Sequence, residues 1–312
     1  MSEPEVIDVH IHFTRSRAQE KIVFHKPGWP DEWYNCNPEG LDEYLDSEGL
    51  SHLFAINYID INTIIDNRLA RMAADDPQRP AAEEELRGQM TERVRQFNDW
   101  IVEYCKTEPR VTPFVNVDIG VFYGDQQAMM DELETRIEQG AKGVKIHPGL
   151  SRFYPADEKM TPLYERLQSA GIPILSDSGA AGARGGRPVY GEPVNFAPVF
   201  EQFPRLRFIM AHLSTAFWDE RVDIAKRFPQ VQFDVSGGFY SGTLRARDGQ
   251  RNVPIEDATR FLRTIGTDRV MFGTDGPGAD VRACIRQIMG LDLTDEEKED
   301  ILAKNARRFM DM

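Results

Sequence analysis

The N-terminal stretch "VIDVHIHF" combines the apolar residues of a buried strand with one aspartate and two histidines. Side chains alternate between the two faces of a strand, so we expect Asp8, His10 and His12 to share one face and Val9, Ile11 and Phe13 the other. Two imidazoles separated by one residue can reach the same metal ion. The motif therefore predicts a metal site, with two merely hydrogen-bonded histidines as the alternative. Asp8 is expected to accept hydrogen bonds behind the ligands.

Chemically active side chains also stand where later apolar runs end. They are Lys145 and His147 in "GVKIHP", Asp177 in "IPILSDSG", His212 in "LRFIMAHLS", Asp234 in "VQFDVSGG" and Asp275 in "RVMFGTDGP". Histidines kept only for solubility would not collect at such places. For Asp234 we expect a structural hydrogen-bond acceptor, and turn chemistry is the alternative for Asp275, because Asp-Gly-Pro favours turns.

Eight short apolar runs alternate with amphipathic helical patterns. The runs cover residues 6–13, 51–58, 111–118, 143–148, 172–179, 206–214, 231–238 and 269–277. This alternation predicts a parallel sheet closed into a (β/α)8 TIM barrel, whose active sites lie at the carboxyl ends of the strands. An open doubly wound sheet is the alternative. The first run is followed by "HFTRSRAQE" rather than a glycine-rich dinucleotide-binding sequence, and no organic cofactor is expected.

We expect a single barrel domain over residues 1–312 that carries additions to the minimal repeat. A long loop at 14–37 contains Trp29, Trp33 and Tyr34, which could cover an apolar substrate. Residues 67–107 read as a charged helical insertion. Closing helices are expected at about 280–310, where Thr294 and Glu297 form a capping box.

The composition restricts the partners of this protein. Its 312 residues carry a net charge of −14, which argues against nucleic acid or an anionic membrane as partner and leaves a small-molecule substrate. The three cysteines are widely spaced, as free thiols in a reducing compartment are. The N-terminus lacks the pattern of a signal peptide, and we expect a cytoplasmic protein.

Six motifs occur in order along nearly the whole chain: "DVHIH", "GAKGVKIHPG", "FPRLRFIMAHLS", "FPQVQFDVSG", "DRVMFGTDGPG" and "ILAKNARRFM". Through them the chain resembles the amidohydrolase superfamily, in the amidohydrolase family 2 branch that includes aminocarboxymuconate-semialdehyde and resorcylate decarboxylases. The resemblance implies a metal-dependent barrel enzyme with His10 and His12 as metal ligands. It further implies that Asp275 is a ligand and proton-transfer group, that His212 polarises the substrate or moves protons, and that the protein forms a homodimer.

One position departs from the pattern of this family. Members usually carry a histidine on the fifth strand, where this chain has Asp177. Aspartate can also bind metal, so we expect one divalent ion held by His10, His12, Asp177 and Asp275. Zinc is the expected metal, with manganese or iron as alternatives that suit carboxylate ligands.

Several reactions fit such a site. The main prediction is hydrolysis of an amide, ester or lactone by metal-activated water, with Asp275 and His212 as catalytic residues. Decarboxylation of an aromatic or unsaturated acid is the first alternative, and a metal-free lactonase or an inactive barrel is the second. Arginine forks bind carboxylates, which suggests an acidic substrate. The expected substrate-binding residues are Lys145, His147, Arg152, Tyr154 and Arg184.

Overall fold

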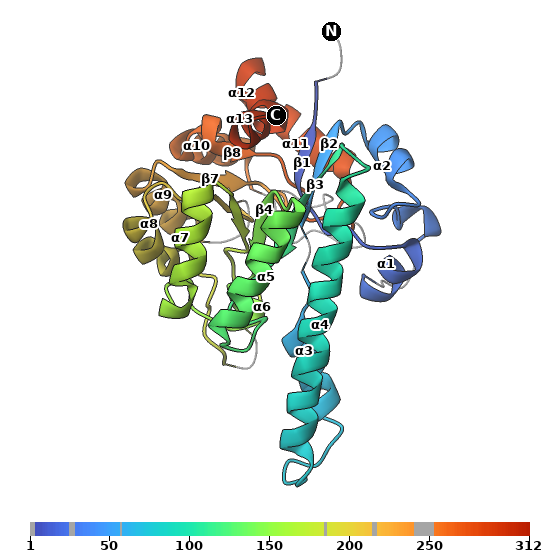
Figure 1. Cartoon of the computed structure of the whole chain (residues 1–312). Helices are drawn as coiled ribbons and strands as arrows, with labels where there is room; N and C mark the ends of the chain where they lie inside the picture. Colours follow the sequence, from blue (N-terminus) through green and yellow to red (C-terminus); the bar gives the residue numbers. More distant parts are fainter. Residues whose placement is uncertain (1–3, 25–28, 57, 184–185, 214–216, 240–252) are drawn as a thin grey trace.

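The computed structural model describes residues 4–24, 29–56, 58–183, 186–213, 217–239 and 253–312. Its centre is a parallel sheet of eight strands in the order β1 to β8 (Figure 1). The strands are β1 (Ile7–Ile11), β2 (His52–Ile56), β3 (Val111–Asn116), β4 (Gly143–Ile146), β5 (Ile174–Ser176), β6 (Phe208–Met210), β7 (Val231–Asp234) and β8 (Val270–Met271). Each strand lies within one of the eight apolar runs.

Main-chain contacts between β1 and the segment around β8 bring the two edges of the sheet together. Ile11 forms a parallel bridge with Gly276, and the Val9 N–H donates to the Phe272 carbonyl at 3.0 Å. The Asp275 N–H donates to the His10 carbonyl at 3.0 Å. The sheet is therefore a nearly closed barrel, as predicted, and these bonds place Asp275 beside His10.

Helices surround the barrel in Figure 1. The α-helices are α1 (Arg17–Val23), α2 (Leu41–Glu48), α3 (Ile61–Leu69), α4 (Arg79–Cys105), α5 (Gln126–Gln139), α6 (Pro148–Ser151), α7 (Thr161–Ala170), α8 (Ala197–Gln202), α9 (Trp218–Arg227), α10 (Ile255–Ile265), α11 (Val281–Met289), α12 (Asp295–Glu299) and α13 (Asn305–Met310). Shorter turns are η1 (Asp31–Trp33), η2 (Glu158–Met160), η3 (Pro193–Phe196), η4 (Thr267–Arg269) and the π-turn η5 (Asp300–Lys304). Thr294 and Glu297 form the predicted capping box at α12. No described helix is long and apolar enough to cross a membrane.

The first strand differs in one respect from the simple alternation. Val9 packs with Ile7 in the apolar cluster inside the barrel, whereas Ile11 belongs to the outer core against the helices. The pairing of β1 with β2 is irregular between Asp8 and Ile11, and such an irregularity shifts the alternation by one residue. The expectation that Val9 and Ile11 share a face was therefore wrong. An irregular register of this kind has no signature in the apolar pattern.

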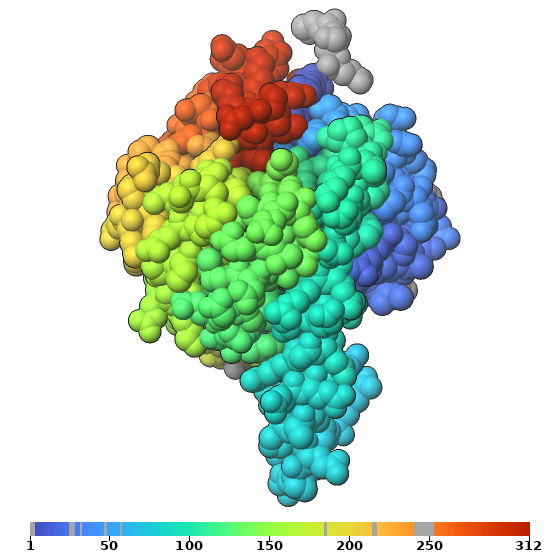
Figure 2. Space-filling view, viewed as in Figure 1, coloured from blue at the N-terminus to red at the C-terminus, as the bar shows by residue number. Residues whose placement is uncertain are grey.

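The long helix α4 and its neighbour α3 extend beyond the body of the barrel (Figures 1 and 2). A buried asparagine, Asn98, fixes α4 to the barrel. Its amide donates to the Asn116 carbonyl and to Glu132 Oε1, both at 3.0 Å, and its oxygen accepts the Asn116 N–H at 2.9 Å. This asparagine therefore links α4 directly to the main chain of β3, beside the buried apolar side chains of the helix.

We predict that Asn98→Ala lowers the free energy of unfolding by about 1–3 kcal/mol, because the buried Asn116 N–H loses its acceptor. Urea denaturation measures this difference. The control is Asn67→Ala on the exposed side of α3, expected to change stability by less than about 0.5 kcal/mol. Equal stabilities of the two variants would contradict the proposed anchoring role.

Candidate active site at the mouth of the barrel

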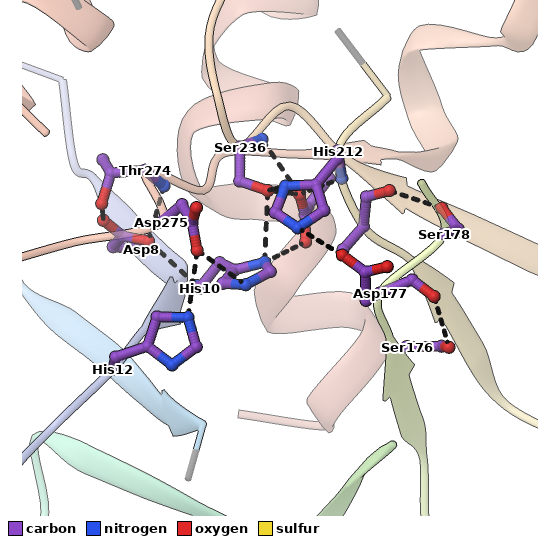
Figure 3. Close-up of polar contacts among 12 residues, drawn as sticks. Asp8, His10, His12, Ser176, Asp177, Ser178, His212, Ser236, Thr274 and Asp275 are labelled. Carbon is purple, nitrogen blue, oxygen red and sulfur yellow. Dashed lines mark hydrogen bonds and ion pairs between the residues drawn. The ribbon is translucent and has the colours of Figure 1, made fainter. Parts of the chain in front are cut away.

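A cavity of about 700 Å³ opens where the strands end. Its floor carries the polar side chains His10, His12, Lys145, Asp177, His212 and Asp275. Its walls are largely apolar and aromatic, with contributions from Phe13, Phe24, Ile56, Tyr58, Ile64 and Phe97. The volume is typical of a small-molecule site. The close-up in Figure 3 shows the polar contacts of the floor.

His10 is fully buried and has one ring nitrogen occupied and one free of hydrogen bonds. Nδ1 lies 2.9 Å from Asp234 Oδ2, so a proton on Nδ1 is donated to this carboxylate. Nε2 is buried without a hydrogen-bond partner and lies 3.4 Å from Asp275 Oδ1. Burial lowers the pKa of His10 to about 4, which keeps the ring neutral. The lone pair of Nε2 is therefore directed toward Asp275, as in a metal-binding histidine oriented by a carboxylate.

His12 approaches the same carboxylate oxygen. Its Nε2 lies 3.0 Å from Asp275 Oδ1, so both histidines of the motif converge on one atom. Burial would raise the pKa of Asp275, but the hydrogen bond with His12 and the charges of His212 and His10 hold it below its usual range. Asp275 has a left-handed φ of 64°, a costly conformation for a non-glycine residue that is typical of functional sites. The carboxylate is therefore ionised and open to the cavity.

His212 pairs with the unusual fifth-strand aspartate. Its Nε2 lies 3.1 Å from Asp177 Oδ2, and its Nδ1 lies 2.8 Å from the hydroxyl of Ser236. That hydroxyl donates to Asp234, so it accepts from Nδ1. Both ring nitrogens of His212 therefore donate, which requires an imidazolium. Burial opposes this charge, but the hydrogen bond to Asp177 and the charge of Asp275 raise the pKa of His212 to about 9.

Hydrogen bonds link these groups across the floor. These bonds connect Asp177 to His212, His212 to Ser236, Ser236 to Asp234 and Asp234 to His10. Figure 3 shows the part from Asp177 through His212 to Ser236. Behind these groups, Asp8 accepts from the Thr274 hydroxyl at 2.6 Å and from two main-chain N–H groups, which fits its expected role as an acceptor. The aspartate expected to be merely structural, Asp234, orients His10.

The donor set fits a divalent metal ion. His10 Nε2 and His12 Nε2 lie around Asp275 Oδ1, and His10 Nε2 has no other partner among the described side chains. His212 also offers a ring nitrogen within 4.8 Å of ligand atoms of His10 and Asp275, but both of its nitrogens donate hydrogen bonds, so His12 is the better second imidazole ligand. Asp177, in contrast, faces His212 and lies 3.7 Å from His147 Nε2. Two imidazoles and one carboxylate suit zinc, manganese or iron.

The residues expected to bind substrate divide into two sets. Lys145 and His147 are buried and line the cavity. Arg152 does not line it and instead pairs with Asp66 on α3, as Arg187 does. Tyr154 is 48% exposed and packs on Tyr190. Arg184 lies outside the described residues.

Tyr58 and Arg93 are among the lining residues that the sequence did not single out. Tyr58 follows β2, and its ring lies 4.5 Å from that of His147. Arg93 comes from α4, inside the segment predicted only as a charged insertion. The sequence does show that Arg93 and Phe97 are four residues apart, and residues at this spacing share one face of a helix. This spacing was the only sequence feature that grouped Arg93 with an apolar residue of the cavity.

This arrangement defines a class of protein, the barrel enzymes whose imidazoles and carboxylates meet at the carboxyl ends of parallel strands. The sequence model of the amidohydrolase family matches residues 7–311. The chain therefore belongs to this family, as its motifs predicted. A comparison with curated protein sequences found no match.

Solved structures with the same fold include three that cover nearly all of the chain. An uncharacterised TIM-barrel protein from Bordetella bronchiseptica has a TM-score of 0.68 at 16% identity, with 98% of each chain covered. A 2,6-dihydroxybenzoate decarboxylase from Rhizobium has a TM-score of 0.66 at 16% identity, covering 100% of this chain and 99% of its own. A dihydroxybenzoic acid decarboxylase from Polaromonas sp. JS666, with bound manganese and the inhibitor 2-nitroresorcinol, has a TM-score of 0.67 at 16% identity, covering 100% and 97%. At such identities these similarities establish the fold.

Proposed function

We propose that this protein is a metal-dependent decarboxylase of a small aromatic or unsaturated carboxylic acid. The observation that carries the proposal is an ionised acceptor, Asp275, and a protonated donor, His212, on one floor beneath mainly apolar walls. Apolar walls suit the planar ring or unsaturated body of such an acid. The decarboxylases among the solved structures of this fold support the same reaction.

In this proposal His10, His12 and Asp275 would hold the metal, whose positive charge would bind substrate oxygens and stabilise the developing negative charge. Asp275 is ionised and can accept a proton from a substrate hydroxyl. As the bond to the carboxyl carbon breaks, carbon dioxide leaves and the electron pair stays on the substrate carbon. The proton held between His212 Nε2 and Asp177 Oδ2 is then delivered to that carbon. Asp275 returns its proton to the substrate oxygen, and one proton from the solvent restores His212.

Hydrolysis is the second candidate, because an ionised Asp275 beside two imidazoles could equally accept the proton of a water molecule. The two reactions need the same residues but release different products. The apolar walls favour decarboxylation over the hydrolysis that the sequence suggested first.

We predict that the protein, reconstituted separately with manganese and zinc, releases carbon dioxide from at least one member of a panel of hydroxybenzoates and unsaturated acids. The measurement combines a coupled carbon dioxide assay with chromatography of the decarboxylated product. A chelator is expected to abolish the activity, and re-addition of the metal to restore it. Hydrolysis of parallel ester, lactone or amide substrates without any release of carbon dioxide would overturn the proposal.

A further inference from the structure

The outer rim of the cavity carries a positive charge that the proposed reaction does not use. Arg93 lines the cavity from α4, while the reacting groups stand on the strand ends at the floor. Within the described part of the chain, the Arg93 guanidinium makes no hydrogen bond and no ion pair. Arginines elsewhere around the mouth are engaged, as Arg152 is with Asp66.

A second guanidinium reinforces the positive rim. Arg15 stacks on Phe97 at 5.6 Å and donates to the Gln96 carbonyl, both on α4. Burial and the positive charge of Arg93 lower the pKa of Arg15, so the two like charges lie close to each other. Arg15 does not line the cavity itself, so its charge adds to the positive potential at the rim while Arg93 alone of the two faces the cavity.

The negative charges of the lining are already committed. Asp60 caps the N-terminus of α3 by accepting the Thr63 N–H at 3.0 Å. Asp177 and Asp275 are paired with histidines at the floor. No described carboxylate of the lining is therefore paired with Arg93, and its guanidinium is open to an anion.

We infer that Arg93 forms an anion-binding subsite at the rim, which holds a second oxyanion of the substrate at the end remote from the reacting carboxylate. The identity of the reacting carboxylate rests on the proposed function. The binding of an anion by Arg93 does not depend on it. Phe97, one helical turn away on the same face, packs against the apolar body between the two anionic ends. The cavity of about 700 Å³ has room beyond a single ring. The substrate class is thus an aromatic or unsaturated acid bearing a second carboxylate or comparable oxyanion.

The chain offers a matched control on the same helix. Arg95 lies 3.8 Å from Glu132 and stacks on Phe122 at 5.5 Å, so its guanidinium faces away from the cavity. Arg93→Gln and Arg95→Gln remove the same charge from α4. Only the first removes it from the rim.

The test compares isophthalate with its monomethyl ester, which adds one methyl group and loses one charge. Calorimetric titration of the metal-loaded protein is expected to show about tenfold tighter binding of isophthalate, since a charge-assisted hydrogen bond has this effect at an exposed site. Arg93→Gln should remove this preference and Arg95→Gln should keep it. High salt should reduce the preference, because Arg93 is exposed.

Equal binding of the two ligands by the unsubstituted protein, or an unchanged preference in Arg93→Gln, would overturn the rim subsite. The outcome is separable from the proposed reaction. Charge preference without release of carbon dioxide from any acid keeps the subsite and rejects the decarboxylase. Release of carbon dioxide without a preference for isophthalate would support the decarboxylase and reject the rim subsite.

Discussion

Replacing Asp275 with asparagine is expected to lower kcat by about a thousandfold or more. The carboxylate oxygen that contacts both His10 and His12 becomes part of a neutral amide, which neither binds a divalent ion well nor accepts a proton. The effect combines a lost metal ligand with a lost proton acceptor. Steady-state kinetics and metal content by elemental analysis measure the two losses separately.

The control for this variant is Asp292→Asn, an exposed carboxylate outside the cavity, expected to keep full activity and metal content. The two substitutions change the net charge equally. If Asp275→Asn retained more than about a tenth of the activity, Asp275 would be neither an essential ligand nor an essential proton acceptor.

Replacing Asp177 with asparagine is expected to lower kcat by about a hundredfold while the metal content stays unchanged. Asp177 stabilises the protonated form of His212, whose pKa it helps raise to about 9. Without this carboxylate, only the charges of Asp275 and Asp234 oppose the burial that lowers the pKa of His212. A rate that needs the protonated ring falls in the parent protein as the pH rises through about 9. In the variant this fall should begin at a lower pH.

Profiles of kcat against pH for the two proteins measure this shift. The same variant separates two roles of Asp177. Loss of the metal from Asp177→Asn would show that this residue is the fourth ligand expected from the sequence. An unchanged alkaline limb together with full metal content would show that Asp177 does not act on His212.

The sequence predicted much of the barrel, because each buried parallel strand is a short apolar run that can be recognised in the sequence. The same logic placed His10, His212 and Asp275 at one mouth, since the carboxyl ends of parallel strands meet there. The irregular register within β1 was not predicted, because one extra residue in a strand does not change the apolar composition of the run.

Side-chain partners were harder to predict than side-chain positions. Arg152 was expected to bind substrate because it follows a strand, but Asp66 on α3, far away in sequence, neutralises it. Arg93 lines the cavity because α4 packs against the barrel, through its buried apolar side chains and through Asn98 against β3. Asp177 stands at the position of a family ligand, yet the ring of His212 lies within hydrogen-bond distance of it. Such pairings depend on tertiary geometry that short-range patterns do not contain.

The central claim is that Asp275 binds the metal with the two histidines of β1, whereas Asp177 binds His212. The most direct test is a crystal of the manganese-loaded protein, with diffraction measured at the manganese absorption edge. We expect one anomalous peak at bonding distance from His10 Nε2, His12 Nε2 and Asp275, with Asp177 still hydrogen-bonded to His212. A peak bonded to Asp177, or no peak at the barrel mouth despite stoichiometric manganese in solution, would contradict the account.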